Sequence, residues 1–173
     1  QKVRRRARKA EQQQQRRINI FGRVSDKLWA VFVKYLPPEP PSGRRGRPIV
    51  PFRKNLGGIL YRLRTGCQWK AIPAEFGSGS TCHRRFQEWQ AVGIFAQVWA
   101  DQLRAYDRKR GIAWNWQILD SAIMPAPLGG DKTGKNPTDR AKSGSKRHVL
   151  VDRRGVPLAL TVSAANTPDY QCA

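Results

Sequence analysis

The sequence predicts a mostly helical region over residues 24–111, followed by the first strands of a second domain over 112–173. Apolar residues recur at helical spacing from Ser25 to Gly111. After Gly111 the spacing changes to the alternation and short apolar runs of strands. Three predicted strands without helices to cover them make an incomplete domain.

The composition points to a polyanionic partner. The chain has 173 residues, with 33 Lys and Arg against 12 Asp and Glu, a net charge of +21 and a pI of about 11.2, which is atypical of a neutral metabolic enzyme. Six Trp, six Phe and four Tyr predict at least one packed core. No run of about 18 apolar residues occurs, so we expect no membrane segment. Cys67, Cys82 and Cys172 form no CxxC pair, and we expect reduced thiols.

Residues 1–23 are expected to be a basic leader that is disordered, or frays as a helix, when free. Arginines and lysines dominate it, with Glu11 as the one acidic residue and a Gln run at 12–15. A solvated leader and an arm that contacts phosphates both fit this composition.

Helices are expected at 26–36, around 56–63, at 80–92 and at 94–109. Ser25 can cap the first, and Pro37 ends it. In the second, Leu56, Ile59, Leu60 and Leu63 share one face before Gly66. Residues 69–76 predict a short helical turn, and Gly111 ends the last helix.

The helix at 80–92 is the candidate recognition helix of a helix-turn-helix arrangement. Ser80 would cap it, and Cys82, Phe86 and Trp89 would form its buried stripe, so that its polar residues face water or DNA. The alternative is an ordinary solvated surface. The DNA-binding residues predicted around this motif are Arg62, Arg64, Lys70, Thr81, Arg84 and Arg85.

A proline-rich linker over 37–51 contains a second candidate DNA contact. Arg45 and Arg47 flank Gly46 and precede Pro48, which is the short core of an AT-hook. Such an Arg-Gly-Arg segment lies in a narrow minor groove, because Gly lets the backbone approach the floor. A flexible basic linker fits the same four residues.

Asp120 is the most informative carboxylate. It ends a predicted strand at 116–120, and a second and third strand at 146–152 and 156–163 would form a hairpin around Arg153-Arg154-Gly155. A carboxylate beside basic residues suits Mg²⁺-assisted phosphoryl transfer, although most strand-end Asp residues begin turns. The predicted DNA contacts of this region are Lys142, Lys146 and Arg147.

Two other motifs are weak. Residues 129–136 nearly match a phosphate-binding loop, but Asn136 replaces the Mg²⁺-binding hydroxyl and Pro137 follows. Cys67, Cys82, His83 and His148 lack the spacing of a zinc site, and Cys82 is expected to be buried.

Several ordered motifs resemble bacterial insertion-sequence transposases. LRTGCQWKAIPAEFG (63–77) and STCHRRFQEW (80–89) resemble the N-terminal region of these proteins. ILDS (118–121), APLGGDKTGKNPTDR (126–140), KSGSKR (142–147) and VDRRGVPL (151–158) resemble the start of their Asp-Asp-Glu catalytic domain. The resemblance spans roughly residues 25–169 and implies an α/β ribonuclease-H-like fold, of which this chain would hold the first three strands.

In that family two Asp and one Glu hold two Mg²⁺ (or Mn²⁺) ions. Asp120 matches the first Asp, which makes it the predicted catalytic residue and metal ligand. Asp169 follows the hairpin too early to match the second Asp, and Asp152 is expected to form a turn. The resemblance therefore implies the N-terminal part of a transposase, truncated at its C-terminus.

Such a protein would bind the double-stranded terminal repeats of its transposon in the bacterial cytoplasm, in association with the nucleoid. As a homo-oligomer, the complete enzyme would cleave and transfer strands with Mg²⁺. Alone, this chain is expected to be inactive and to bind no metal tightly. The alternative is a non-catalytic DNA-binding remnant or regulator of transposition; RNA binding is disfavoured.

Overall fold

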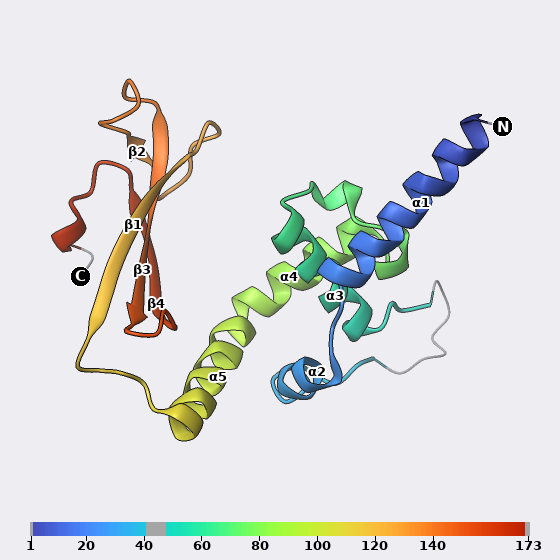
Figure 1. Cartoon of the computed structure of the whole chain (residues 1–173), viewed down its shortest axis with the longest axis horizontal. Helices are drawn as coiled ribbons and strands as arrows, with labels where there is room; N and C mark the ends of the chain where they lie inside the picture. Colours follow the sequence, from blue (N-terminus) through green and yellow to red (C-terminus); the bar gives the residue numbers. More distant parts are fainter. Residues whose placement is uncertain (1, 41–47, 172–173) are drawn as a thin grey trace. The chain divides into compact units, whose positions relative to one another are not determined.

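A computed structural model describes residues 2–40 and 48–171, with the side chains of 2–4 and 7 excepted. It divides into two compact units, Gln1–Asp101 and Gln102–Ala173, and each is described by itself. The predicted order of helices followed by a sheet is confirmed (Figure 1).

The first unit is helical. Its elements are α1 (Lys2–Phe21), α2 (Asp26–Phe32), α3 (Phe52–Thr65), the 3-10 helices η1 (Trp69–Ala71) and η2 (Ala74–Phe76), α4 (Gly79–Ala91), and the first turns of α5 (Ile94–Arg110). Ser25 caps α2 as predicted, because its hydroxyl accepts from the Leu28 N–H at 3.2 Å. Gly66 ends α3 with φ of 69°, which is the expected left-handed position. Two bounds differ: α2 ends at Phe32, before the expected 36, and α4 is capped by Ser78 in place of Ser80.

The basic leader, expected to be disordered or to fray as a helix, is helical in the structure. Residues 2–21 form α1, and Ile18 near its C-terminal end is buried in a cluster with Tyr61, Ile72 and Phe76. The apolar C-terminal turn of α1 packs onto α3, and Arg and Gln have good helix propensity, which together favour the helix over a disordered segment.

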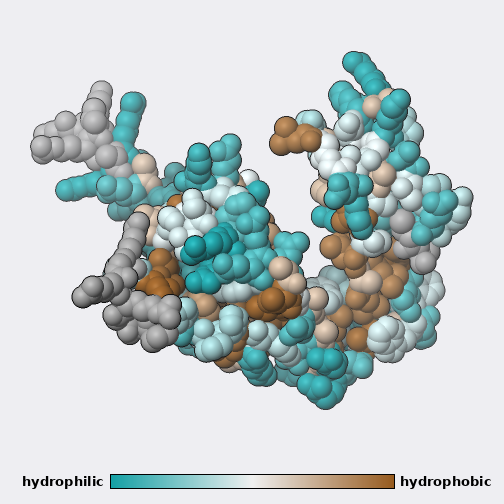
Figure 2. Space-filling model, turned by 180° about the vertical axis from the view of Figure 1, so that it is seen from behind, coloured by the Kyte–Doolittle hydropathy of each residue, from teal (hydrophilic) through white to brown (hydrophobic). Residues whose placement is uncertain are grey.

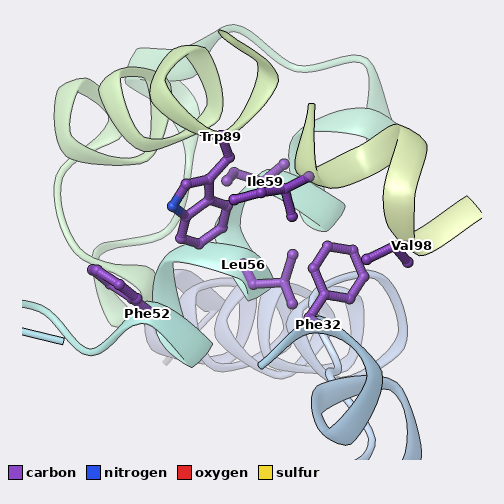
Figure 3. Close-up of a cluster of buried hydrophobic side chains, with 7 residues drawn as sticks. Phe32, Phe52, Leu56, Ile59, Trp89 and Val98 are labelled. Carbon is purple, nitrogen blue, oxygen red and sulfur yellow. The ribbon is translucent and has the colours of Figure 1, made fainter. Parts of the chain in front are cut away.

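Aromatic and branched side chains from α2, α3, α4 and α5 form the main core (Figure 3). The fully or nearly fully buried members are Phe32, Phe52, Leu56, Ile59, Trp89, Ile94 and Val98. Phe52 and Trp89 meet edge to face with ring centroids 5.6 Å apart. The predicted apolar face of α3 is confirmed at Leu56 and Ile59 and wrong at Leu63, which lies in the last turn of the helix and is 57% exposed.

The helices approach closely at two glycines. A Cβ on Gly57 or Gly58 would overlap the Phe76 ring or Cys82 Sγ. Cys82 is buried as predicted, and burial raises the pKa of its thiol to about 11, against a weaker opposing backbone hydrogen bond. The α3 glycines thus let η2 and the start of α4 pack directly on the helix.

The second unit is an antiparallel sheet, described here as β1 (Gln117–Pro125), β2 (Gly134–Lys135), β3 (Ser143–Asp152) and β4 (Pro157–Ala164), followed by η3 (Asp169–Gln171). β3 is central: β1 pairs along one edge, and β4 and the short β2 pair along the other. The three predicted strands are confirmed, although β1 continues to Pro125. The addition is β2, which falls in the expected loop.

Asp152 builds the turn of the β3–β4 hairpin, as predicted. Its carboxylate accepts the backbone N–H groups of Arg154 and Val156, each at 2.9 Å, and that of Ala113 at 3.4 Å. Burial alone would raise the pKa of Asp152. The three N–H donors and the Arg154 guanidinium outweigh that effect, so its pKa lies below the ordinary value.

The sheet exposes apolar side chains on both faces. Ile118 and Leu160 lie on one face, and Leu119 lies on the other; their exposed fractions are 49%, 65% and 37%. On the side of the sheet unit turned to the viewer, Figure 2 shows part of this apolar surface as brown atoms. The large side chains that are buried in this unit are polar: His148 and Asp152.

Candidate nucleic-acid interface

At the N-terminal end of α4, polar side chains are held in place by hydrogen bonds. Ser78 caps the helix, accepting from the Thr81 N–H at 3.1 Å, and the Ser78 and Thr81 hydroxyls lie 2.8 Å apart. Gly79 lets the helix begin against the Trp69 carbonyl, because a Cβ there would overlap its oxygen. Thr81, a predicted DNA contact, therefore lies at the exposed start of the helix.

A hollow of about 300 Å³ adjoins this end of α4. Its lining combines the extended segment after the linker with the first turns of α4: Pro48, Ile49, Val50, Asn55, Ser78, Thr81, Arg84 and Arg85. Asn55 is buried, and its side-chain amide donates to the Val50 carbonyl at 3.1 Å, which holds the segment against α3. The segment that lines the hollow is thus fixed to α3, and the rest of the lining carries the Ser78 and Thr81 hydroxyls and the two arginines.

The two arginines of α4 differ in their surroundings. The Arg84 side chain is 65% exposed and lies 3.7 Å from Glu88. The Arg85 side chain is only 17% exposed: its guanidinium lies over the Phe52 ring at 4.8 Å and donates to Glu88 at 2.7 Å. The prediction that the helix directs both arginines away from the core is correct for Arg84 and wrong for Arg85. The reason is that Phe52, at the start of α3, extends the core beneath this position.

Two of the other residues predicted to contact DNA in this unit, Arg62 and Arg64, also make contacts within the fold. Arg64 donates to the Phe21 carbonyl at 3.0 Å and so caps the end of α1. The Arg62 guanidinium lies 5.7 Å from the Trp69 ring centre, and His83 stacks on the same ring at 4.8 Å. Lys70 is exposed beside them. Arg45 and Arg47 lie outside the described residues.

In the sheet unit, Asp120 and Arg147 share a face. Asp120 pairs with Val149 on β3, and Ala122 pairs with Arg147. Because side chains two residues apart on a strand point to the same side, Asp120 and Arg147 are diagonal neighbours. Both are exposed. Lys146 lies on the opposite face.

The two lysines predicted to contact DNA in this unit are ion-paired. Lys146 is 13% exposed and donates to Asp169 at 3.0 Å and to the Thr167 carbonyl at 2.8 Å. Lys142 is 65% exposed and lies 3.1 Å from Asp139. Sequence reasoning did not single out the partner role of Asp169 or the burial of His148, since both depend on how the segment after β4 folds back on the sheet.

Within the described residues, Asp120 is not part of a cluster of metal-binding side chains. Within residues 2–40 and 48–171, no three His, Cys, Asp or Glu side chains gather as a cation site. A pair of Mg²⁺ ions needs several carboxylate oxygens, so the described residues do not fit such a centre by themselves. No described helix is both long and apolar enough to cross a membrane.

Comparison with known proteins connects this architecture to mobile elements. The family model "Putative transposase of IS4/5 family (DUF4096)" matches residues 24–99, which contain α2 to α4. "Insertion element IS402 uncharacterized 16.2 kDa protein" of Burkholderia cepacia is 37% identical over 121 residues, which is 66% of this chain and 80% of that protein. No solved structure matches the chain.

Two further relatives match shorter stretches. "Putative transposase for insertion sequence element IS402", also of Burkholderia cepacia, is 54% identical over 52 residues, 30% of this chain and 23% of that protein. "Uncharacterized protein y4sN" of Sinorhizobium fredii (strain NBRC 101917 / NGR234) is 27% identical over 88 residues, 50% of this chain and 66% of that protein.

Proposed function

We propose that this chain, which belongs to the IS4/5 family of insertion-sequence transposases, binds duplex DNA through the N-terminal end of α4. In this reading α3 and α4 act as a helix-turn-helix whose connection is widened by η1 and η2. The DNA is that of the transposon ends, so that the protein acts at the bacterial nucleoid, in the cytoplasm.

The observation that carries the proposal is the hollow at the start of α4. Backbone N–H groups, and the one of the Ser78 and Thr81 hydroxyls that does not donate to the other, can donate to a phosphate at a helix N-terminus, where the helix dipole also favours an anion. Arg84 projects beside them with an exposed guanidinium. The net charge of +21 supplies the long-range attraction that a polyanion requires.

For the sheet unit we propose the beginning of a ribonuclease-H-like catalytic domain. Three long antiparallel strands in the order β1, β3, β4, with Asp120 on the first, support this reading. The missing ligands and the helices over the sheet would come from a complete, homo-oligomeric enzyme, with Mg²⁺ or Mn²⁺ as its cofactor. Because the described residues do not assemble a metal centre, no catalytic step is derived from them.

The test of DNA binding is an affinity series from 50 to 200 mM salt on a duplex of unrelated sequence and on a transposon end. We expect log K to fall linearly with log salt, and Arg84→Ala to weaken binding and reduce the slope by about one. Arg153→Ala, an exposed arginine of the β3–β4 hairpin, is the matched control. A flat salt dependence, or equal effects of the two variants, would contradict the proposal, as would tighter binding to single-stranded RNA.

A non-catalytic DNA-binding protein is the second candidate, and the lack of a three-ligand cation group in the described ranges favours it. We expect the 173-residue chain to bind DNA without cutting it in Mg²⁺ or Mn²⁺. Asp120→Ala should leave binding unchanged. Metal-dependent cleavage that disappears in Asp120→Ala would instead establish an active enzyme.

A further inference from the structure

The sheet face opposite Asp120 carries a hydrogen-bonded network centred on Asp169. Ser121 Oγ on β1 donates to one Asp169 carboxylate oxygen at 3.0 Å. Lys146 Nζ on β3 donates to the other at 3.0 Å, and to the Thr167 carbonyl at 2.8 Å. Both carboxylate oxygens are therefore engaged, and they connect β1, β3 and the segment after β4.

A buried histidine extends the network to β4. His148 is 1% exposed, and its Nε2 lies 2.8 Å from Ser163 Oγ. Its Nδ1 has no hydrogen-bond partner and faces the Asp169 carboxylate at 3.8 Å. The polar residues of this face thus reach all three long strands of the sheet.

Hydrophobic patterning specifies the register of β1 only weakly. Ile118 and Met124 are on the Asp120 face, Leu119 and Ile123 are on the other, and three of the four are substantially exposed. Register is strongly set only where one face of a strand is buried and the other is not. A one-residue slip of β1 would cost little apolar burial, yet it would move Asp120 to the opposite face from Arg147.

We propose that Asp169 is a positioning residue: by holding Ser121 of β1 to Lys146 of β3, it sets the register that places Asp120 beside Arg147. Ser121 follows Asp120 directly, so its hydrogen bond acts one residue from the side chain to be placed. A strand slipped by one residue would leave the Lys146–Asp169 pair without its third member, because either Asp120, a like charge, or Ala122 would replace Ser121 beside the carboxylate. The Asp169 side chain is 56% exposed, but its Lys146 partner is only 13% exposed, so a slip of β1 costs a hydrogen bond to a charged network that is partly shielded from water.

This assignment gives Asp169, which the sequence leaves without a role, a function distinct from that of Asp120. Asp120 is exposed and has no hydrogen-bond or ion-pair partner within the described ranges, whereas Asp169 is bound by Ser121 and Lys146. The register is a property of the sheet and holds whether or not the proposed function is correct. Only its importance for catalysis rests on the proposed role of Asp120.

Nuclear magnetic resonance on the 173-residue chain can test the register directly. Cross-strand NOEs between Ser121 and His148, and between Ile123 and Lys146, report the β1–β3 pairing, while those between Leu150 and Ala159 report the β3–β4 pairing. In Asp169→Ala we expect the β1–β3 NOEs to vanish or shift, with the β3–β4 NOEs retained. The β1 amides should exchange with solvent about tenfold faster or more, the effect of losing one charge-assisted hydrogen bond.

Two further variants complete the test. Asp139→Asn is the matched control, because it removes an aspartate paired to a lysine at 3.1 Å on the surface of the same unit, and it should change nothing in β1. Ser121→Ala removes only the β1 contact, and it decides the matter if Asp169→Ala unfolds the whole sheet. Unchanged β1–β3 NOEs and exchange in Ser121→Ala and Asp169→Ala, or an equal effect of Asp139→Asn, would overturn the proposal. Neither DNA nor metal enters these measurements, so failure of the proposed function would not be mistaken for failure of this one.

Discussion

The helical unit and the sheet unit bury different kinds of side chain. The centre of the helical unit is apolar, with Leu56 and Ile59 fully buried and Trp89 1% exposed. The largest buried side chains of the sheet unit are His148 and Asp152, and its branched residues are at the surface or half-buried. In the first unit, apolar burial holds the fold together. In the second, hydrogen bonds to a few charged groups hold the conformation, and apolar side chains such as Ile118 and Leu160 remain exposed.

The largest effect should come from the core of the helical unit. Trp89→Ala removes a ring that packs edge to face on Phe52, and we expect a loss of about 3–5 kcal/mol in the free energy of unfolding from the cavity it leaves. Trp99→Ala, at a position 46% exposed on α5, is the control and should cost far less. Urea unfolding followed by circular dichroism at 222 nm measures both. Equal losses would contradict the assignment of Trp89 to the core.

Acid should destabilise the sheet unit before it destabilises the helical unit. Hydrogen bonds from Lys146 and then Ser121 lower the pKa of Asp169; for Asp152, burial is outweighed by three backbone N–H donors, so that its pKa is lowered as well. A carboxyl group whose folded-state pKa is depressed contributes stability above its unfolded-state pKa of about 3.9, and that stability is lost as pH falls through the folded-state value.

We therefore expect the sheet resonances to disperse poorly below about pH 4, before those of the Trp89 core. Spectra recorded from pH 7 to pH 3 report this directly. The double variant Asp152→Asn plus Asp169→Asn should be less stable at pH 7 and should show a flatter dependence on pH. The same dependence of sheet stability on pH in the native sequence and in the double variant would contradict the importance of these two carboxylates.

The order of elements and most of the caps and turns were predictable from the sequence because they depend on local chemistry, although the cap of α4 is Ser78 in place of the predicted Ser80. Ser25, Gly66 and the Asp152 turn act within a few residues of themselves, and the predictions at all three are confirmed. The apolar repeat likewise predicted Cys82 and Trp89 as buried. Where the outcome depends on a distant segment, the sequence decided less. It left open whether the leader is a helix, which packs Ile18 beside Tyr61, and it gave the wrong direction for Arg85, which lies over Phe52.

The candidate sites follow the same division. That Asp120 lies on a strand was predictable, but it lies within β1 and not at the predicted end of the strand. Which of Lys146 and Arg147 shares its face required the register of β1 and β3. The contacts of Asp169 form because the segment after β4 folds back on the sheet, and no local sequence pattern predicts this. The DNA contacts assigned to Thr81, Arg84 and the other basic residues stay predictions.

The two arginines of α4 allow stability and DNA binding to be separated. Arg85→Ala removes a guanidinium stacked on Phe52 and mostly buried, and we expect a loss of about 1–2 kcal/mol in the free energy of unfolding. Arg84→Ala, on the same helix one residue earlier, should leave stability within about 0.5 kcal/mol, because its contact to Glu88 is exposed. Chemical denaturation measures both. If the two variants unfold alike, Arg85 has no structural role beyond that of a surface residue.

The smallest effect tests whether the sheet depends on a specific ion pair or on charge in general. Lys142 and Lys146 lie at nearly equal distances from their aspartates, 3.1 and 3.0 Å, but their side chains are 65% and 13% exposed. An exposed pair gains little because water screens it and both side chains lose freedom, so Lys142→Ala should change the free energy of unfolding by about 0.5 kcal/mol or less. Lys146→Ala removes a donor to both Asp169 and the Thr167 carbonyl and should destabilise the sheet clearly more.

Thermal unfolding of the sheet, followed by its resonances at two salt concentrations, distinguishes the two pairs. Added salt should abolish the small effect of Lys142→Ala and leave most of the effect of Lys146→Ala. Equal, salt-sensitive losses in the two variants would mean that general charge balance, and not the network around Asp169, stabilises this unit.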